Sequence, residues 1–432
     1  MDRDLVATGG FVVLFVMMFL RVPVGIAMGI VGIAGFGLLT SWRAAFNLLA
    51  QSPFSTVTDF NLSVVPMFIL MGAFASGSGM SRDLFSASRA WLGHLRGGLG
   101  IATIATCGGF AAINGSSVAT AATMTQVALP ELRRAGYSDK LSTGMIAAGG
   151  TLGIMIPPSV IFVLYGIITN QDVTKLFMAG IVPGILGMLM YMATLRFIVW
   201  RNPDAVPQVS RANWHDRVSS LASIWPAALL FAFVIGGLYG GLFTITEAAG
   251  IGAMGALIIG VLQGRLGPAS IMECLITSLR TTAAIFTIVI GAYLCGYFLT
   301  ITQTTQNIID FLVNLPVGPY GVLFLVIVVY LVLGALMDEL AIILVTVPVV
   351  FPAMMQLGFD PTWFGVVIVM TCTLGMICPP VGMNVFVINS LARDVSLGSI
   401  YRGVTPFIVS DLIRLFLICA IPALSLYLPN TM

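Results

Sequence analysis

Residues 151–159 read TLGIMIPPS, and residues 373–380 read TLGMICPP. Each stretch sets a glycine and two adjacent prolines inside a run that is otherwise apolar enough to cross a membrane. Because proline has no N–H group and breaks a helix, both stretches predict a membrane helix that is interrupted at its centre. An interruption that occurs twice, 222 residues apart, indicates a duplicated architecture.

The composition predicts an all-α polytopic protein embedded in a lipid bilayer. Of the 432 residues, 58% are hydrophobic and 8% are charged, and the mean hydropathy is +1.04. A soluble domain carries about a quarter charged residues. The net charge of +2 forms no basic patch, which argues against a nucleic-acid partner. No phosphate-binding loop motif and no cluster of nucleophile, base or metal ligands stands out, so neither ATP hydrolysis nor another enzymatic activity is expected.

Apolar runs between arginine, glycine and proline breaks predict about ten membrane spans and two re-entrant hairpins. The spans are expected near 5–20, 22–40, 60–78, 141–169, 176–195, 218–241, 246–263, 270–300, 363–391 and 404–428. Two further apolar segments, 97–130 and 318–352, are interrupted near their middles by NGSS (114–117) and MDE (337–339). We interpret both of these segments as hairpins that enter and leave on one side.

With hairpins of this kind, the arginine and lysine residues sort strongly to one side of the membrane. Only Arg3, Arg43 and Lys175 fall on the other side, and Arg414 lies within a span. The basic side is expected to be cytoplasmic, which places both chain ends outside. The fifteen residues on the basic side are Arg21, Arg82, Arg89, Arg96, Arg133, Arg134, Lys140, Arg196, Arg201, Arg211, Arg217, Arg265, Arg280, Arg393 and Arg402.

A shift of 222 residues aligns the two opening stretches with each other. It also aligns further pairs of identical residues, among them Pro130 with Pro352. The loop 131–140 carries three cations, whereas its counterpart 353–362 carries none, so equivalent loops are expected on opposite sides. We therefore predict two inverted-topology repeats, 1–217 and 218–432. Each would hold five spans and a hairpin, with one of the five spans broken. Inverted repeats with interrupted helices are typical of secondary transporters, whose binding sites lie at those interruptions.

The prolines are expected to leave backbone carbonyls without their helical partners. Pro157 and Pro158 would free the carbonyls of Gly153 and Ile154, and the second pair of prolines would free those of Gly375 and Met376. An unpartnered carbonyl in hydrocarbon is costly unless something binds it, and a dehydrated Na⁺ is a suitable ligand. The hydroxyls of Thr151 and Thr373 could add to the two sets of oxygens. The second half-helix would begin at the prolines, and its free N–H groups would favour an anion.

The hairpin tips are expected to face these breaks. The first tip offers the side-chain oxygens of Asn114, Ser116 and Ser117, and the second offers Asp338 and Glu339 near Gly334. Intramembrane carboxylates are functional by default, but a surface loop is an alternative for the acidic pair, and which of the two acids faces the site is left open. A simple kink is the alternative for each proline pair, and an ordinary turn is the alternative for NGSS.

Several stretches resemble the large membrane subunit of a tripartite ATP-independent periplasmic (TRAP) transporter. They are VPMFILMG (65–72), NGSSVATAA (114–122), GYSDKLSTGMIAAGGTLGIMIPPSVIFVLYG (136–166), LFTITEAA (242–249) and LGALMDELAIILVTVPVVFP (333–352). The family usually has proline where this chain has Ile245. Within LFTITEAA, Glu247 could belong to a site, but Thr244 and Glu247 also form a capping box for the next helix, and we favour the cap.

The resemblance implies an elevator-type, sodium-coupled symporter for small organic acids in the bacterial inner membrane. It also implies two partners: a small membrane subunit of about four helices and a soluble periplasmic substrate-binding protein. The family's first sodium site maps onto the first hairpin tip and break, and its second onto 334–338 and 373–378. The expected sodium-site residues are Asn114, Ser116, Gly153, Ile154, Ile156, Pro158, Gly334, Asp338, Thr373, Gly375, Met376 and Cys378. The expected substrate-site residues are Ser117, Thr151, Pro157, Ser159 and Pro380.

We therefore predict an importer that binds two or more Na⁺ with each organic anion. The nearest alternative is a stand-alone carboxylate:cation symporter of similar inverted-repeat fold, which would work without a binding protein. A passive anion channel or a structural membrane subunit is a more remote alternative. Which organic acid is carried is left open, because the binding protein is expected to supply much of the selectivity.

Overall fold

The computed structural model describes residues 3–20, 22–202 and 213–432, and all of the regular structure in these ranges is helical. Arg21 and Arg211 of the predicted charge sorting lie outside the described residues. The elements are α1 (Arg3–Phe19), α2 (Val24–Leu39), α3 (Trp42–Val57), η1 (Phe60–Ser63), α4 (Val64–Gly77), α5 (Met80–Leu92), α6 (Gly98–Asn114), α7 (Ser117–Arg134), α8 (Asp139–Met155), α9 (Val160–Thr169), α10 (Val173–Arg201), α11 (Trp214–Tyr239), α12 (Ile245–Leu262), α13 (Pro268–Ile301), α14 (Thr304–Val313), α15 (Gly318–Leu336), α16 (Glu339–Gln356), α17 (Pro361–Gly375), α18 (Met383–Leu391), α19 (Leu397–Ala420), α20 (Ala423–Leu426) and η3 (Pro429–Thr431).

The helices agree with an all-α membrane protein, and the predicted breaks fall between helices. Among the described residues, eight helices are long and apolar enough to cross a membrane, and the pair α8–α9, bent by 42°, could form a ninth span. Helices α1 and α2, both expected to span, are apolar but shorter than this length. The number of ten spans stays a prediction.

Three helices were not expected from the sequence. Helices α5 and α14 connect the neighbouring long helices α4 and α13 to the two predicted hairpins, and α3 follows α2. Each mixes polar and apolar residues, so it lacks the continuous apolar run by which a membrane span is recognised. Helix α5, for example, is amphipathic and carries Arg82, Asp83 and Arg89. Such a helix can lie along the membrane–water interface.

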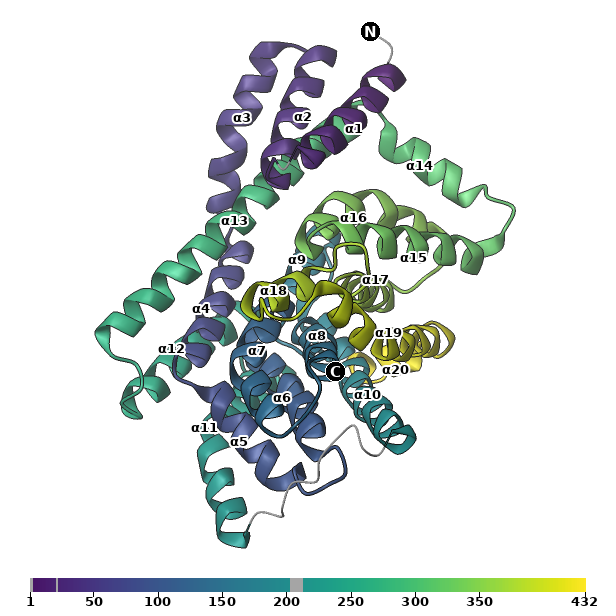
Figure 1. The fold of residues 1–432 in the computed structure, drawn as a ribbon. Coiled ribbons are helices and arrows are strands. Elements are labelled where there is room, and N and C mark those ends of the chain that lie inside the picture. The colour runs from purple at the N-terminus through teal and green to yellow at the C-terminus, as the bar shows by residue number, and fades with distance from the viewer. Residues whose placement is uncertain (1–2, 21, 203–212) are drawn as a thin grey trace.

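One group of helices is organised around α13, the longest helix described. Figure 1 shows α13 running diagonally, with α2 and α3 along one part of it and α4 along another. Helix α12 packs on α4, and α11 packs on both α12 and α5. Glycines permit the closest of these approaches, because a Cβ at Gly25 would stand 2.6 Å from the carbonyl oxygen of Thr287. None of these helices belongs to the two broken helices α8–α9 and α17–α18. The group contacts the rest of the protein through α4, which packs on α9, and α13, which packs on α16.

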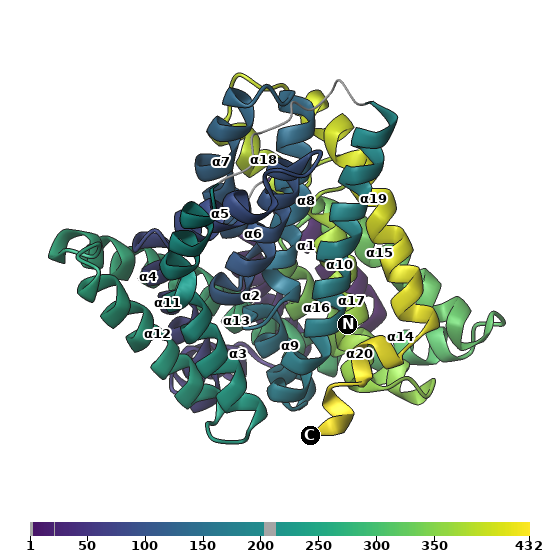
Figure 2. The same ribbon diagram turned by 90° about the horizontal axis from the view of Figure 1, so that it is seen from below.

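The other group interlocks the two halves of the chain. Helix α7 of the first half packs on α18 of the second, and α9 of the first half packs on α16 of the second. Likewise α8 packs on α19, and α17 packs on α10. Figure 2 shows α7 and α18 together at one end of the molecule. These pairs join elements that the two predicted repeats would make equivalent. The repeats and their inverted insertion stay predictions.

Loops that were sorted to the same side of the membrane come together in space. Lys140, Arg201 and Arg402, all on the predicted cytoplasmic side, line one surface pocket. Asp59 and Asn170, both in loops on the predicted outer side, line another pocket of about 610 Å³. The grouping of these loops is consistent with the predicted charge sorting.

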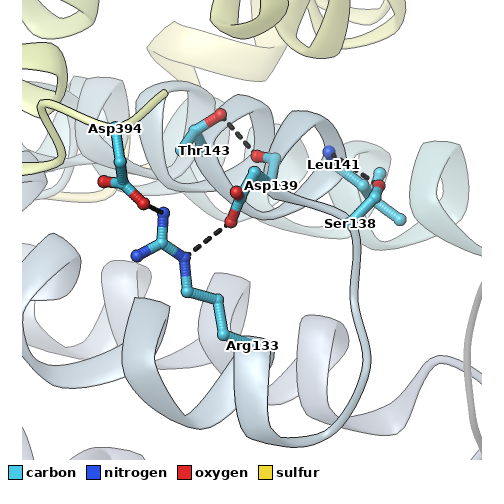
Figure 3. A network of polar contacts seen from close by, with 6 residues as sticks. All are labelled: Arg133, Ser138, Asp139, Leu141, Thr143 and Asp394. Carbon is cyan, nitrogen blue, oxygen red and sulfur yellow. Dashed lines mark hydrogen bonds and ion pairs between the residues drawn. The ribbon is translucent and has the colours of Figure 1, made fainter. Parts of the chain in front are cut away.

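An ion-pair network on the basic side joins the first hairpin to the end of the second broken helix (Figure 3). Arg133 donates to Asp139 at 2.6 Å and to Asp394, which is 261 residues away in the chain, also at 2.6 Å. The hydrogen bond to Asp139 raises the pKa of the Arg133 guanidinium above its ordinary value. Ser138 caps α8 by accepting from the N–H of Leu141, so the turn between α7 and α8 is held at both ends.

Candidate functional site

The first hairpin tip lies directly on the first break. A Cβ at Gly115, between α6 and α7, would stand 2.4 Å from the carbonyl oxygen of Pro158, and this glycine has a φ of +65°. A Cβ at Gly153 would stand 2.5 Å from the carbonyl oxygen of Ser116. Both positions therefore require glycine, one for its conformation and both for the close approach of two backbones. The expectation that this tip faces this break is confirmed.

Side chains of the first tip hold its own backbone. Ser116 is the N-cap of α7, and its hydroxyl accepts from the N–H of Ala119 at 3.3 Å. The Ser116 carbonyl accepts from the Thr120 hydroxyl at 2.8 Å. Asn114 donates its amide to the same hydroxyl oxygen at 3.3 Å. The tip is consequently a preformed turn of oxygen-bearing groups rather than a flexible loop.

The first break leaves two carbonyls open, as the prolines predicted. Helix α8 ends at Met155, and among the described residues no backbone hydrogen bond from outside the helix reaches the carbonyls of Gly153 and Ile154. The expectation that the next half-helix begins at the prolines is wrong. Helix α9 begins at Val160, and Ser159 caps it by accepting from the N–H of Phe162, because a serine hydroxyl satisfies an N–H group of the first turn whereas residues 156–158 form a bend.

The second hairpin tip lies on the second break in the same way. A Cβ at Gly375 would stand 2.5 Å from the Cα of Gly334, so α15 and α17 touch backbone to backbone. The carbonyl of Ala335 accepts from the N–H groups of Val381 and Gly382 at 3.2 and 3.3 Å. The second tip is thus hydrogen-bonded to the second break.

The expectation that the second break leaves the carbonyls of Gly375 and Met376 open is wrong. The Gly375 carbonyl accepts from the N–H of Cys378 at 3.0 Å, and the Met376 carbonyl accepts from the N–H of Asn384 at 3.2 Å. The break spans residues 376–382. The Cys378 N–H reaches Gly375 within a local turn, and Gly382, at a φ of +58°, lies between Met376 and the Asn384 donor and permits the chain to fold back there. The second break therefore differs from the first, because its two carbonyls already accept backbone hydrogen bonds. Each of these carbonyl oxygens keeps one lone pair for a further ligand.

Both tips meet at one cavity of about 430 Å³. Asn114 and Ser116 line it from the first tip, and Asp338 and Glu339 line it from the second. Residues of α4 and α13 form the opposite wall, and the start of α9 closes the space between the tips. Among the described lining residues there is no lysine, arginine or histidine. The cavity therefore offers oxygen atoms and carboxylates, and no basic side chain.

The two acids of the second tip have different partners. Asp338 is the N-cap of α16 and accepts from the N–H of Leu340 at 3.0 Å. Glu339 is 6% exposed, and its Oε2 has no hydrogen-bond partner among the described residues. Both acids line the cavity. The role of each in a functional site stays a prediction.

The two predicted threonines lie one turn before the breaks and do not line this cavity. The Thr151 hydroxyl donates to the carbonyl of Ala148 at 2.6 Å, and it also lies within hydrogen-bond distance of the Tyr191 hydroxyl, at 2.9 Å. Thr373 donates to the carbonyl of Met370 at 2.8 Å. Both are fully buried, so their proposed contact with ions or substrate stays a prediction.

The remaining predicted residues surround the breaks. Ser117 accepts from the side-chain amide of Asn384 at 2.7 Å, which joins the first hairpin to α18. The Pro380 carbonyl accepts from the Tyr401 hydroxyl at 3.0 Å. Ile156, Pro157 and Pro158 are buried in the first break, and Cys378 is half-buried in the second. The capping box of Thr244 and Glu247, favoured over a site role, is confirmed by reciprocal hydrogen bonds.

A buried polar network near both breaks was missed by sequence reasoning. Tyr191 of α10 donates to Asp411 of α19, and Asp411 pairs with Arg414 at 2.8 Å. The Arg414 side chain fits only because position 187 is glycine, where a Cβ would stand 1.5 Å from the guanidinium. Acidic and basic residues three apart inside a predicted span were the available signal. The network connects the turn before the first break to α19.

We expect Tyr191→Phe to lower the thermal unfolding midpoint of the purified chain. The substitution removes one hydrogen bond from the buried Asp411 carboxylate, which costs about 1.5–3 kcal/mol. Tyr427→Phe is the matched control, because that side chain is 67% exposed. Equal midpoints for the two variants in a thermal unfolding assay would contradict a stabilising hydrogen bond between Tyr191 and Asp411.

The sequence that forms these hairpins and breaks matches a known protein family along nearly its whole length. The family described as "Tripartite ATP-independent periplasmic transporter, DctM component" matches residues 11–424. The chain belongs to this family. It is the large permease subunit of a TRAP transporter, which is a transporter component and not an enzyme class.

Curated relatives carry the same designation. The chain is 38% identical over 387 residues to the C4-dicarboxylate TRAP transporter large permease protein DctM of Pseudomonas aeruginosa, covering 88% of this chain and 89% of that one. It is 31% identical over 416 residues to the sialic acid TRAP transporter large permease protein SiaM of Vibrio cholerae, covering 96% of each. It is also 32% identical to the isethionate TRAP transporter permease protein DctMQ of Oleidesulfovibrio alaskensis, of which it spans 65%.

The fold also has a solved counterpart outside these relatives. The YdaH transporter of Alcanivorax borkumensis superimposes with a TM-score of 0.63 at 15% sequence identity, covering 90% of this chain and 88% of that one. At this identity the likeness concerns the fold alone.

Proposed function

We propose that this TRAP permease subunit is a sodium-coupled symporter that imports a small organic acid anion. The observation that carries the proposal is the cavity between the two hairpin tips, which combines the buried Glu339 and the half-buried Asp338 with polar oxygens and, among the described lining residues, no basic side chain. An anion in such a place has no arginine or lysine to balance its charge. Cations must therefore enter with it, and the open carbonyls of Gly153 and Ile154 are suitable ligands for Na⁺.

Two or more Na⁺ ions per anion follow from the same charge argument. The carboxylates of Asp338 and Glu339 and the carboxylate of the substrate all carry negative charge when ionised. Burying them together without counter-ions would be very costly in a medium of low polarity. The free energy of the sodium gradient would then drive uptake.

The transport step is proposed to be of the elevator type. The hairpins α6–α7 and α15–α16, the broken helices α8–α9 and α17–α18, and the helices α10 and α19 would move together, because they interlock across the two halves. The helices α1–α4 and α11–α13 would be the fixed scaffold. Helices α5 and α14 link the two groups, and the cavity lies at the contact between them.

The proposed partners are a small membrane subunit and a soluble periplasmic binding protein, and the proposed location is the bacterial inner membrane. The names of the relatives support this: one is a permease protein DctMQ, whose length exceeds that of this chain, and all belong to tripartite systems by family. The Pseudomonas aeruginosa relative is a C4-dicarboxylate permease, so C4-dicarboxylates are the first substrates to test.

The partner requirement is tested by reconstitution in liposomes. Uptake of radiolabelled C4-dicarboxylate under an inward Na⁺ gradient is expected only when this chain, the small subunit and the binding protein are all present. The partners are chosen from neighbouring genes that encode a small membrane protein and a secreted protein. Uptake by this chain alone would favour a stand-alone symporter, and equilibration without accumulation would favour a passive channel.

A further inference from the structure

Glu339 is a buried carboxylate with an unpartnered oxygen. Its side chain lines the cavity at the second hairpin tip, it is 6% exposed, and its Oε2 has no hydrogen-bond partner among the described residues. The adjacent Asp338 also lines the cavity, and its Oδ1 is engaged in capping α16. A carboxylate in this position is too costly to leave as a bare charge.

A second residue that carries an unpartnered buried oxygen lines the same cavity from a different element. Ser278 of α13 is also 6% exposed, and its Oγ has no hydrogen-bond partner among the described residues. Buried polar atoms of native proteins are nearly always satisfied, so two such atoms on residues that line one cavity favour a ligand between the second hairpin and α13. Thr277 and Thr281 add further hydroxyl oxygens on the same part of α13.

The chemistry of these atoms favours a metal cation over a proton. A proton on Glu339 would neutralise its carboxylate. The Ser278 oxygen would still have no hydrogen-bond partner, unless the two side chains bonded directly to each other. A hard cation takes several oxygen ligands at once and would satisfy both atoms while balancing the charge. Among the described lining residues, no lysine, arginine or histidine could do so instead.

We propose that Glu339 and Ser278 form a Na⁺ site between the second hairpin and helix α13, separate from the carbonyl sites at the two breaks. This inference rests on the proposed sodium coupling. Helix α16 packs on α13, and the cavity lies between the tips and that helix. Because Glu339 belongs to the hairpin and Ser278 to the proposed scaffold, the ion would bridge the moving and fixed parts. The site would therefore exist only in this arrangement of the two parts and would stabilise it.

The test is the number of Na⁺ ions bound by the purified full chain. Equilibrium binding of ²²Na⁺ is measured at constant ionic strength with choline as the balancing cation. Glu339→Gln is expected to bind one ion fewer than the wild type. Ser278→Ala is expected to keep the number but to raise the half-saturating concentration of one site roughly tenfold, because one ligand is lost. Glu273→Gln, on the exposed face of α13, is the matched control and should equal the wild type.

Each outcome decides the proposal. Wild-type stoichiometry and affinity in both Glu339→Gln and Ser278→Ala would overturn it, and would leave a protonated Glu339 or a cationic group of the substrate as the neutralising partner. Binding of no Na⁺ by the wild type would overturn the sodium coupling itself, so the two failures are distinguishable. Gel filtration of each variant shows whether it is folded, and Ser278→Ala decides alone if Glu339→Gln does not fold.

Discussion

Accumulation of substrate by proteoliposomes is expected to fall to background when choline replaces external Na⁺. The complete system, with the small subunit and binding protein, would be compared at equal osmolarity and equal membrane potential. The reason is electrostatic: the cavity holds Asp338 and Glu339 and no described basic residue, so an anion cannot enter it without cations. Choline is too large for a site made of carbonyl and carboxylate oxygens.

The dependence on Na⁺ concentration provides a second measure in the same assay. Two or more coupled ions predict a sigmoidal curve, with a Hill coefficient above one. A control with an inward K⁺ gradient in place of the Na⁺ gradient separates ion identity from membrane potential. Equal accumulation in choline and in Na⁺ would rule out sodium coupling, whichever residues bind the substrate.

Gly153→Ala is expected to weaken Na⁺ binding at the first break by roughly 10- to 100-fold. The new methyl group would stand 2.5 Å from the Ser116 carbonyl oxygen and 2.7 Å from the Thr120 hydroxyl. Overpacking of this kind costs about 1–3 kcal/mol, and the backbone must shift where the open carbonyls lie. The half-saturating Na⁺ concentration for uptake is the measurement.

The chain offers a close control for this substitution. Gly250 lies in α12, and a Cβ there would meet nothing within 4 Å, so Gly250→Ala should transport like the wild type. Gly375→Ala applies the same test to the second break, where the methyl group would stand 2.5 Å from the Cα of Gly334. If Gly153→Ala and Gly250→Ala gave the same Na⁺ dependence, the first break would not be an ion site.

The parts of the site that could be predicted from the sequence are those determined by local covalent constraints. Proline lacks an N–H wherever it stands, so Pro157 and Pro158 cannot donate to the carbonyls of Gly153 and Ile154. That these carbonyls stay open also requires that no other backbone donor reaches them, which holds at the first break and fails at the second. Asn-Gly-Ser-Ser encodes a turn and an N-cap, and the structure places Ser116 as that cap. Because the hairpin and the break each occur twice in the sequence, the contact between each hairpin tip and its break could be predicted.

The parts that could not be predicted depend on tertiary contacts. Whether the carbonyl of Met376 is open depends on Asn384, which reaches it only after the chain reverses at Gly382. Ser278 stands in an otherwise ordinary membrane helix, and only the packing of the second hairpin against α13 places it at the cavity. The amphipathic helices α5 and α14 were missed because polar residues recur along their sequences, so neither contains the continuous apolar run by which a membrane span is recognised.

The exchange of partners between the two halves has a consequence for how the protein is made. Ser117 of the first hairpin receives its hydrogen bond from Asn384, which is 267 residues later in the chain. At about 5–20 residues per second, a ribosome needs between roughly ten seconds and a minute to synthesise that interval. During this time α7 and α9 lie in the bilayer without α18 and α16, with polar groups and small-residue surfaces uncovered. Insertion factors that shield such helices should therefore determine yield more strongly for this fold than for membrane proteins whose neighbouring helices pair in sequence order.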